Sequence, residues 1–190
     1  MLLRAATYPV MPWKNGGGTT REVAVFPHGA SMEDFDWRIS MATVAQDGAF
    51  SCLPDIERTL FLLEGAGMVL KFDEHSPVEL RPVDVIEHFA ADTKVFARLL
   101  DGPITDLNIM TRRSRMTHQA VKHRIVGNSH ITHRRGSTLA LVFLDDGLQL
   151  VQNNTTVALQ ALDCFLLEAD SAGVTLQSNG LMIQIEFELK

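Results

Sequence analysis

The chain lacks the features that mark several classes of protein. Its 190 residues include only two cysteines, Cys52 and Cys164, far apart and without a CxxC spacing, which argues against a disulfide scaffold and a thiolate metal site. No apolar run reaches the ~18 residues that a bilayer-spanning helix needs. The N-terminus also lacks the apolar core and cleavage site of a signal peptide. We therefore expect a cytoplasmic protein that does not act at a membrane.

Basic residues are outnumbered by acidic ones. The 17 Lys and Arg residues and 23 Asp and Glu residues give a net charge of −6, which excludes a globally basic nucleic-acid binder. Residues 112–135 differ, because they contain basic residues and no acid. This segment is either a solvated connector between two structural halves or a surface that attracts anions. It contains no Phe, Tyr or Trp on which bases could stack, so nucleic acid is not an expected partner.

Long amphipathic helical patterns are scarce, and the apolar stretches are short, β-branched and separated by turn residues, which predicts an all-β fold. A hairpin is predicted from Phe61–Leu63 through a glycine-containing turn to Met68–Leu70. The best helical candidate is a turn or two at Ser31–Phe35, which Ser31 would cap. Further strands are predicted at residues 93–100, 104–110, 138–144, 162–167 and 181–189.

The apolar pattern occurs twice. The stretch that starts at Thr59 matches the stretch that starts at Thr138, 79 residues later, and the same offset relates 78–80 to 157–159 and 83–86 to 162–165. This repetition predicts a duplicated unit, each copy a small antiparallel β-barrel or jelly roll. We expect one barrel in residues 1–111, the basic connector in 112–136 and the second barrel in 137–190, packed together as one compact body.

A glycine-rich stretch, residues 12–22, is the most unusual in the chain. Three consecutive glycines, Gly16 to Gly18, are tolerated where the backbone turns tightly or closely approaches another group. The stretch is not a P-loop, and it is either a flexible turn before a strand or part of a binding site. The second interpretation rests on the aromatic and charged residues around the glycines, among them Trp13, Lys14, Thr20 and Glu22.

Strand alternation identifies further candidates. At 35–41 it places Trp37 in the core and Arg38 on the opposite face, where Arg38 either lines a cavity or is solvated. At 104–112 it places Asn108 and Met110 on a face shared with Asp106 and Arg112, a combination suited to the floor of a pocket. Arg58 comes just before an apolar strand. It either belongs to the binding site or forms a surface ion pair with Glu57 or Asp55.

Histidines are present but badly placed for metal binding. His28, His75, His88 and His118 are isolated, and the closely spaced His130 and His133 lie in the basic segment, which would repel a cation. We therefore expect no metal and no other cofactor. The sequence also contains no G-x-S-x-G elbow and assembles no nucleophilic triad, so the catalytic residues, if any, stay unknown.

Five stretches together resemble the HutD/Ves family: residues 12–22, 35–40, 47–51, 58–65 and 101–113. The resemblance covers about residues 11 to 113, and it implies a bicupin fold, in agreement with the duplication. It also implies an accessory or regulatory role in histidine utilisation. Cupins commonly hold a metal through a histidine and glutamate motif, and this chain has that motif in neither half.

These observations favour a non-enzymatic protein that binds a small anionic product of histidine breakdown, such as urocanate, formiminoglutamate or formylglutamate. Lys14, Arg38 and Arg58 would neutralise carboxylates, while other residues would supply hydrogen bonds and apolar walls. The alternatives are a metal-free isomerase or hydrolase, with a histidine or Glu22 as general base, and a protein-interaction module. The sequence leaves open whether the protein is a homodimer. The predicted ligand-binding residues are Trp13, Lys14, Asn15, Thr20, Glu22, Arg38, Arg58, Asn108 and Met110.

Overall fold

The computed structural model describes residues 1–73, 76–82, 86–169 and 171–190. The chain divides into two compact units, which we call the first unit (Pro9–Met116) and the second unit (Met1–Tyr8 with Thr117–Lys190). His75 and residues 83–85 of the predicted repeat lie outside the described residues.

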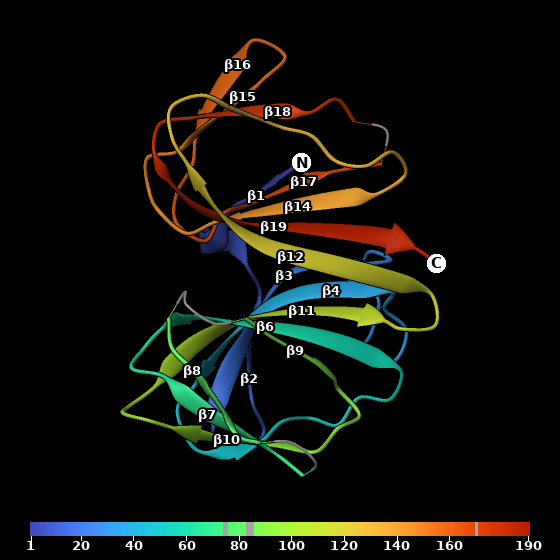
Figure 1. Ribbon diagram of the computed structural model, residues 1–190, viewed down its shortest axis with the longest axis vertical. Helices are drawn as coiled ribbons and strands as arrows, with labels where there is room; N and C mark the ends of the chain where they lie inside the picture. Colours follow the sequence, from blue (N-terminus) through green and yellow to red (C-terminus); the bar gives the residue numbers. More distant parts are fainter. Residues whose placement is uncertain (74–75, 83–85, 170) are drawn as a thin grey trace. The chain divides into compact units, whose positions relative to one another are not determined.

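The first unit contains two antiparallel sheets (Figure 1). The larger sheet has, in order, β2 (Val10–Pro12), β3 (Gly18–Phe26), β4 (Trp37–Val44), β11 (Ile104–Arg112), β6 (Ile56–Glu64) and β9 (Ile86–Ala90). The smaller sheet has β5 (Gly48–Ala49), β10 (Val95–Leu99), β7 (Met68–Phe72) and β8 (Val78–Leu80). Side chains from both sheets meet in one apolar core, for example Leu60 and Leu62 of β6 with Met68 and Leu70 of β7.

The second unit also contains two sheets. Its larger sheet has β1 (Leu2–Leu3), β17 (Cys164–Leu167), β14 (Thr138–Phe143), β19 (Gly180–Leu189) and β12 (Met116–Ile125). Its smaller sheet has β13 (Ser129–Ile131), β18 (Val174–Gln177), β15 (Gln149–Gln152) and β16 (Thr155–Ala158). Leucine side chains dominate the core of this unit, which also contains Phe143 and Phe165. The short 3₁₀ helix η1 (Ala5–Thr7) follows β1; no helix in the described part of the chain is long and apolar enough to span a membrane.

The strand orders confirm the duplication. In the larger sheets, β4-β11-β6-β9 of the first unit corresponds to β12-β19-β14-β17 of the second. In the smaller sheets, β5-β10-β7-β8 corresponds to β13-β18-β15-β16. Leu62 in β6 and Leu141 in β14 therefore occupy corresponding strands, as the sequence repeat predicts. The fold is the expected all-β bicupin, in which each unit is an antiparallel jelly roll.

The predicted hairpin at 61–70 is wrong in its pairing. Strand β6 pairs with β9 and β11, whereas β7 pairs with β8 and β10 in the other sheet. The turn between β6 and β7 thus carries the chain from one sheet to the other, and it needs glycine: Gly65 has φ +99°, and a Cβ there would lie 2.7 Å from the carbonyl oxygen of Pro103. Residues 31–35 form turns, not a helix, although the Glu33 amide does donate to Ser31 Oγ.

The basic segment and the N-terminus differ from the predicted domain boundaries. Residues 116–125 and 129–131 form β12 and β13 where a connector is expected, because an end strand of a sheet tolerates charged side chains that stay in water. The first eight residues belong to the second unit. They are held there by the pairing of β1 with β17 and by an ion pair of 2.7 Å between Arg4 and the fully buried Asp163.

Candidate functional site

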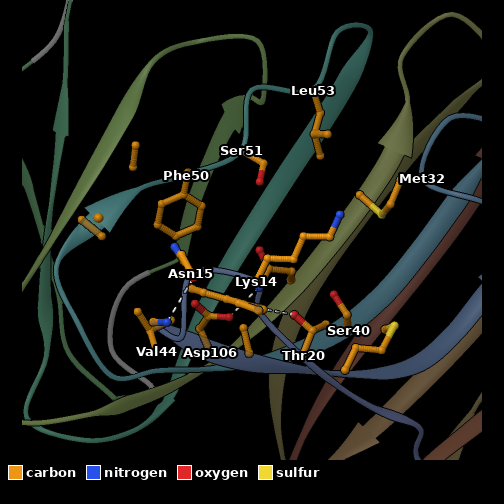
Figure 2. A pocket seen from close by; sticks show the side chains of 18 of the residues that line it. Lys14, Asn15, Thr20, Met32, Ser40, Val44, Phe50, Ser51, Leu53 and Asp106 are labelled. Atoms are coloured by element: carbon orange, nitrogen blue, oxygen red, sulfur yellow. Dashed lines mark hydrogen bonds between the residues drawn. The ribbon is translucent and has the colours of Figure 1, made fainter.

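A cavity of about 780 Å³ lies inside the first unit. Strands β3, β4, β6 and β11 of the larger sheet supply its floor, while residues 11–17 and 46–53 supply much of its wall. Figure 2 shows Lys14, Phe50 and Asp106 around the same space. A cavity of this size, with apolar walls and a few polar groups that converge on it, is typical of a small-molecule site.

Eight of the nine residues predicted to bind a ligand line this cavity. They are Trp13, Lys14, Asn15, Thr20, Arg38, Arg58, Asn108 and Met110. Glu22, the ninth, is not among the lining residues. Its carboxylate instead accepts a hydrogen bond of 2.9 Å from Arg38 Nε, so Glu22 acts on the cavity through Arg38.

The register of the larger sheet brings together residues that are far apart in the sequence. Met110 of β11 lies directly opposite Arg38 of β4 on one side and Arg58 of β6 on the other. Two positions along, Asn108 lies opposite Ser40. Residues directly opposite one another in an antiparallel pair point to the same face, so these side chains all face the cavity. The predicted face assignments of these two strands are correct.

Arg58 is the buried cation of the cavity. It is 5% exposed, and its guanidinium carbon lies 5.1 Å from the ring centre of Phe50 and 5.8 Å from that of Phe89. Burial lowers the pKa of Arg58 to about 10, and the neighbouring charge of Asp106 partly opposes this shift. Among the described residues, Arg58 Nε has no hydrogen-bond partner. The alternative of a surface ion pair with Glu57 or Asp55 is wrong, because Arg58 is buried; Glu57 pairs with His88 and Arg113, and Asp55 pairs with Arg112.

Arg38 is already neutralised. In addition to the bond to Glu22, its guanidinium donates to Ser40 Oγ at 3.1 Å. Because Arg38 is 6% exposed, the alternative of a solvated side chain is wrong. Of the two arginines in the floor, Arg58 is therefore the one whose charge no carboxylate of the described residues pairs with in a salt bridge.

The glycine-rich stretch forms an ordered wall of the cavity. The indole of Trp13 donates to Thr20 Oγ1 at 2.8 Å, and Asn15 Oδ1 accepts from the Gly17 amide at 3.0 Å. Gly18 packs so closely that a Cβ there would lie 2.4 Å from the carbonyl oxygen of Thr43 and 3.1 Å from the Trp13 ring. The glycine is needed at this close approach. These contacts hold Trp13 beside the cavity, where Lys14 remains exposed.

Asp106 is the main site residue that the predicted set omits. Its carboxyl group is fully buried, Oδ1 accepts from Asn108 Nδ2 at 2.5 Å, and Oδ2 has no partner among the described residues. Burial raises the pKa of Asp106 to about 7, although Arg58, the Ala42 backbone and Asn108 act in the opposite direction. The alternation at 104–112 does place Asp106 on the pocket face, but local sequence gives no sign of its complete burial.

Phe50 and Ser40 are also missing from the predicted set. Phe50 covers the Arg58 guanidinium, and Ser40 accepts from Arg38. Both belong to stretches that carry the family resemblance, 47–51 and 35–40, and this was the available signal. No histidine lines the cavity in the described part of the chain, so a histidine base is not placed there.

The residues present do not fit the metal centre that cupins commonly hold. Within the described ranges, no group of three His, Cys, Asp or Glu side chains is arranged to bind a metal ion. In the cavity the carboxyl group of Asp106 is accompanied by Arg58, whose positive charge would repel a metal ion, and by Asn108, whose amide nitrogen donates to Asp106.

Comparison with known proteins decides the family. The model of the HutD family matches residues 5–183. The chain belongs to the HutD family. Among curated relatives of this HutD chain, the "21.2 kDa protein in hutC 3'region" of Pseudomonas putida is 32% identical over 97% of the chain and 95% of the relative. Protein Ves of Citrobacter koseri is 37% identical over 73% of the chain and 69% of the relative.

Solved structures agree with this assignment. A conserved protein of Pseudomonas aeruginosa PAO1 is 32% identical, with a TM-score of 0.89. The match covers 99% of this HutD chain and 98% of that protein's chain. HutD of Pseudomonas fluorescens SBW25, solved in a formate condition, is 28% identical, with a TM-score of 0.82. The match covers 100% of this chain and 98% of the P. fluorescens chain. A cupin 2 barrel protein of Leptotrichia buccalis, 9% identical with a TM-score of 0.60 over 90% and 88%, shows the shared fold.

Proposed function

We propose that this protein binds a small anionic metabolite in the cavity of the first unit and has an accessory or regulatory role in histidine utilisation. Membership of the HutD family supports the link to histidine utilisation. The nature of the ligand is a separate step. It rests on the cavity, whose residues favour a small carboxylate over a metal or a nucleic acid.

One observation carries the proposal: the buried guanidinium of Arg58 has donor capacity left in the cavity. A buried charge without a matching partner is costly, and a carboxylate is the planar acceptor that a guanidinium fits best. Phe50 and Met110 flank the guanidinium, so a ligand there would be partly shielded from water and its ionic hydrogen bonds strengthened. Lys14, an exposed residue of the cavity wall, adds a second positive charge.

Urocanate, formiminoglutamate and formylglutamate are the candidate carboxylates, because each is an anionic product of histidine breakdown. A thermal-shift screen against histidine and these compounds finds the best of them. At about 100 times its dissociation constant, a ligand adds roughly 2.7 kcal/mol to stability, which such a screen detects.

Titration calorimetry with the best ligand then tests the role of Arg58. Arg58→Ala removes an ionic hydrogen bond worth roughly 1.5 to 3 kcal/mol, so we expect the dissociation constant to rise about ten- to 150-fold. Arg135→Ala is the matched control, because Arg135 is exposed in the second unit. An equal loss in both variants, or a larger loss for Arg135→Ala, would contradict the assignment of the site.

A metal-free isomerase or hydrolase is the second candidate, and Asp106 is the observation that favours it. Its pKa near 7 suits a general acid or base at neutral pH, whereas Glu22 is engaged by Arg38. Incubation of the purified protein with the same three acids, followed by NMR, separates the candidates. Turnover that Asp106→Asn abolishes would replace the binding proposal with an enzymatic one.

A further inference from the structure

The floor of the cavity has two chemically different ends. At one end, Met110 lies between the paired positions of Arg38 and Arg58. At the other end, four residues along β11, Asp106 lies between Ala42 and Leu62. With a rise of about 3.4 Å per residue, the two rows are roughly 13 to 14 Å apart at the backbone. We call the row of Arg38 and Arg58 the cationic end of the floor and the row of Asp106 its carboxyl end; the charges of Arg58 and Asp106 are still close enough to affect each other's pKa.

At the cationic end, only part of the hydrogen-bonding capacity is used. Arg38 donates to Glu22 and Ser40. Arg58 has a weak contact of 3.8 Å with the sulfur of Met110, and its Nε has no partner among the described residues. For an anion in the cavity, Arg58 is thus the cation at this end that no carboxylate of the described residues already engages.

At the carboxyl end, one oxygen is also unused. Asn108 donates to Asp106 Oδ1, and Asp106 Oδ2 is buried without a partner in the described part of the chain. A buried acceptor without a hydrogen bond destabilises the folded state, and folded proteins rarely contain one. Because Asp106 lines the cavity, the missing partner is either an ordered water or a donor on the ligand.

We infer that the ligand is a two-headed molecule, whose anionic head binds Arg58 and whose N–H donor binds Asp106 Oδ2. The inference rests on the proposed function, because it takes from it the carboxylate at Arg58. It adds the chemical class of the second head: an imidazole, amidine or amide nitrogen that carries a hydrogen. The side chains of Met110 and Phe50, both beside Arg58, offer apolar contacts to the part of the ligand next to its anionic head.

The protonation state of Asp106 is consistent with this arrangement. Burial holds its pKa at about 7, so both forms are populated near neutral pH. A neutral N–H head needs an acceptor oxygen, which the ionised form always presents. A cationic head, such as an amidinium, stabilises the ionised form further, so its binding near pH 7 would release a proton.

A matched pair of ligands tests the inference by titration calorimetry. The probes are urocanate, which is an imidazolyl acrylate, and 3-(furan-3-yl)acrylate, which keeps the carboxylate and the flat ring but has no N–H. We expect the wild-type protein to bind urocanate at least about tenfold more tightly, since a hydrogen bond to a charged acceptor is worth roughly 1.5 to 3 kcal/mol.

Two variants assign the heads. Asp106→Asn replaces the acceptor Oδ2 by an NH₂ donor while the bond from Asn108 can persist, so we expect the preference for urocanate to disappear. Arg58→Gln should weaken both acids by a similar factor and leave the preference in place. Circular dichroism and thermal unfolding check that both variants fold. If Asp106→Asn does not fold, the ligand pair on the wild-type protein still decides the question.

The outcomes separate this inference from the proposed function. If neither acid binds the wild-type protein, both fail. If the two acids bind equally, lose affinity with Arg58→Gln and are unaffected by Asp106→Asn, the site is a simple carboxylate site with a water at Asp106. That result keeps the proposed function and overturns the two-headed ligand.

Discussion

Replacement of Asp106 by asparagine tests the electrostatics of the cavity floor through protein stability, without any ligand. The folded protein holds this carboxyl group in a fully buried position, and burial raises its pKa from the ordinary 3.8 to about 7. Asparagine has nearly the same shape, and its oxygen can still accept the hydrogen bond from Asn108. The substitution therefore changes the charge and leaves the packing nearly unchanged.

The raised pKa fixes the sign of the effect. Between about pH 4 and 7 the folded protein keeps a proton on Asp106 that the unfolded chain has released. Folding then takes up a proton, so the contribution of Asp106 to stability is largest below pH 4 and declines as the pH rises to 7. For one proton the slope is at most about 1.4 kcal/mol per pH unit. Asp106→Asn removes this decline.

The assay is urea denaturation of both proteins at several pH values from 4.5 to 8. We expect the stability of Asp106→Asn, relative to wild type, to increase through this range and to level off above pH 7. Asp92→Asn is the control. The ion pair with Arg113 lowers the pKa of Asp92, so its contribution changes at more acidic pH. Parallel curves for wild type and Asp106→Asn would refute the reasoning.

Two further predictions concern packing. Gly18→Ala would place a Cβ 2.4 Å from the Thr43 carbonyl oxygen and should cost about 1 to 3 kcal/mol. Thermal unfolding should show a larger loss than for Gly48→Ala, where nothing lies within 4 Å and φ is not positive. Leu141→Ala should cost about 2 to 5 kcal/mol in urea denaturation because Leu141 is fully buried in the core of the second unit. Leu189→Ala, at a 75% exposed position, is its control, and similar losses in the two would contradict this description of the core.

The basic segment shows where pattern analysis was insufficient. Its charge suggests a connector, yet residues 116–125 form β12. Likewise, the apolar runs around Gly65 suggest a hairpin, but β6 and β7 belong to different sheets. In both cases the residues adopt a locally ordinary conformation. What the sequence does not reveal is the identity of the strand that pairs with them, because that partner lies far along the chain.

The sequence by itself determined the all-β class, the duplication and the side of each strand on which the site residues lie. These properties follow from the alternation of side chains between the two faces of a strand and from residues that favour turns. Both depend only on neighbouring residues in the sequence. Only the tertiary structure decided that Arg58 and Asp106 share one cavity, that Glu22 neutralises Arg38 and that Asp106 is buried near its titration point. Desolvation and hydrogen bonding depend on the groups that surround a side chain in three dimensions. In this fold those groups come from distant strands: Ala42, 64 residues before Asp106, lies directly opposite it and acts on its pKa.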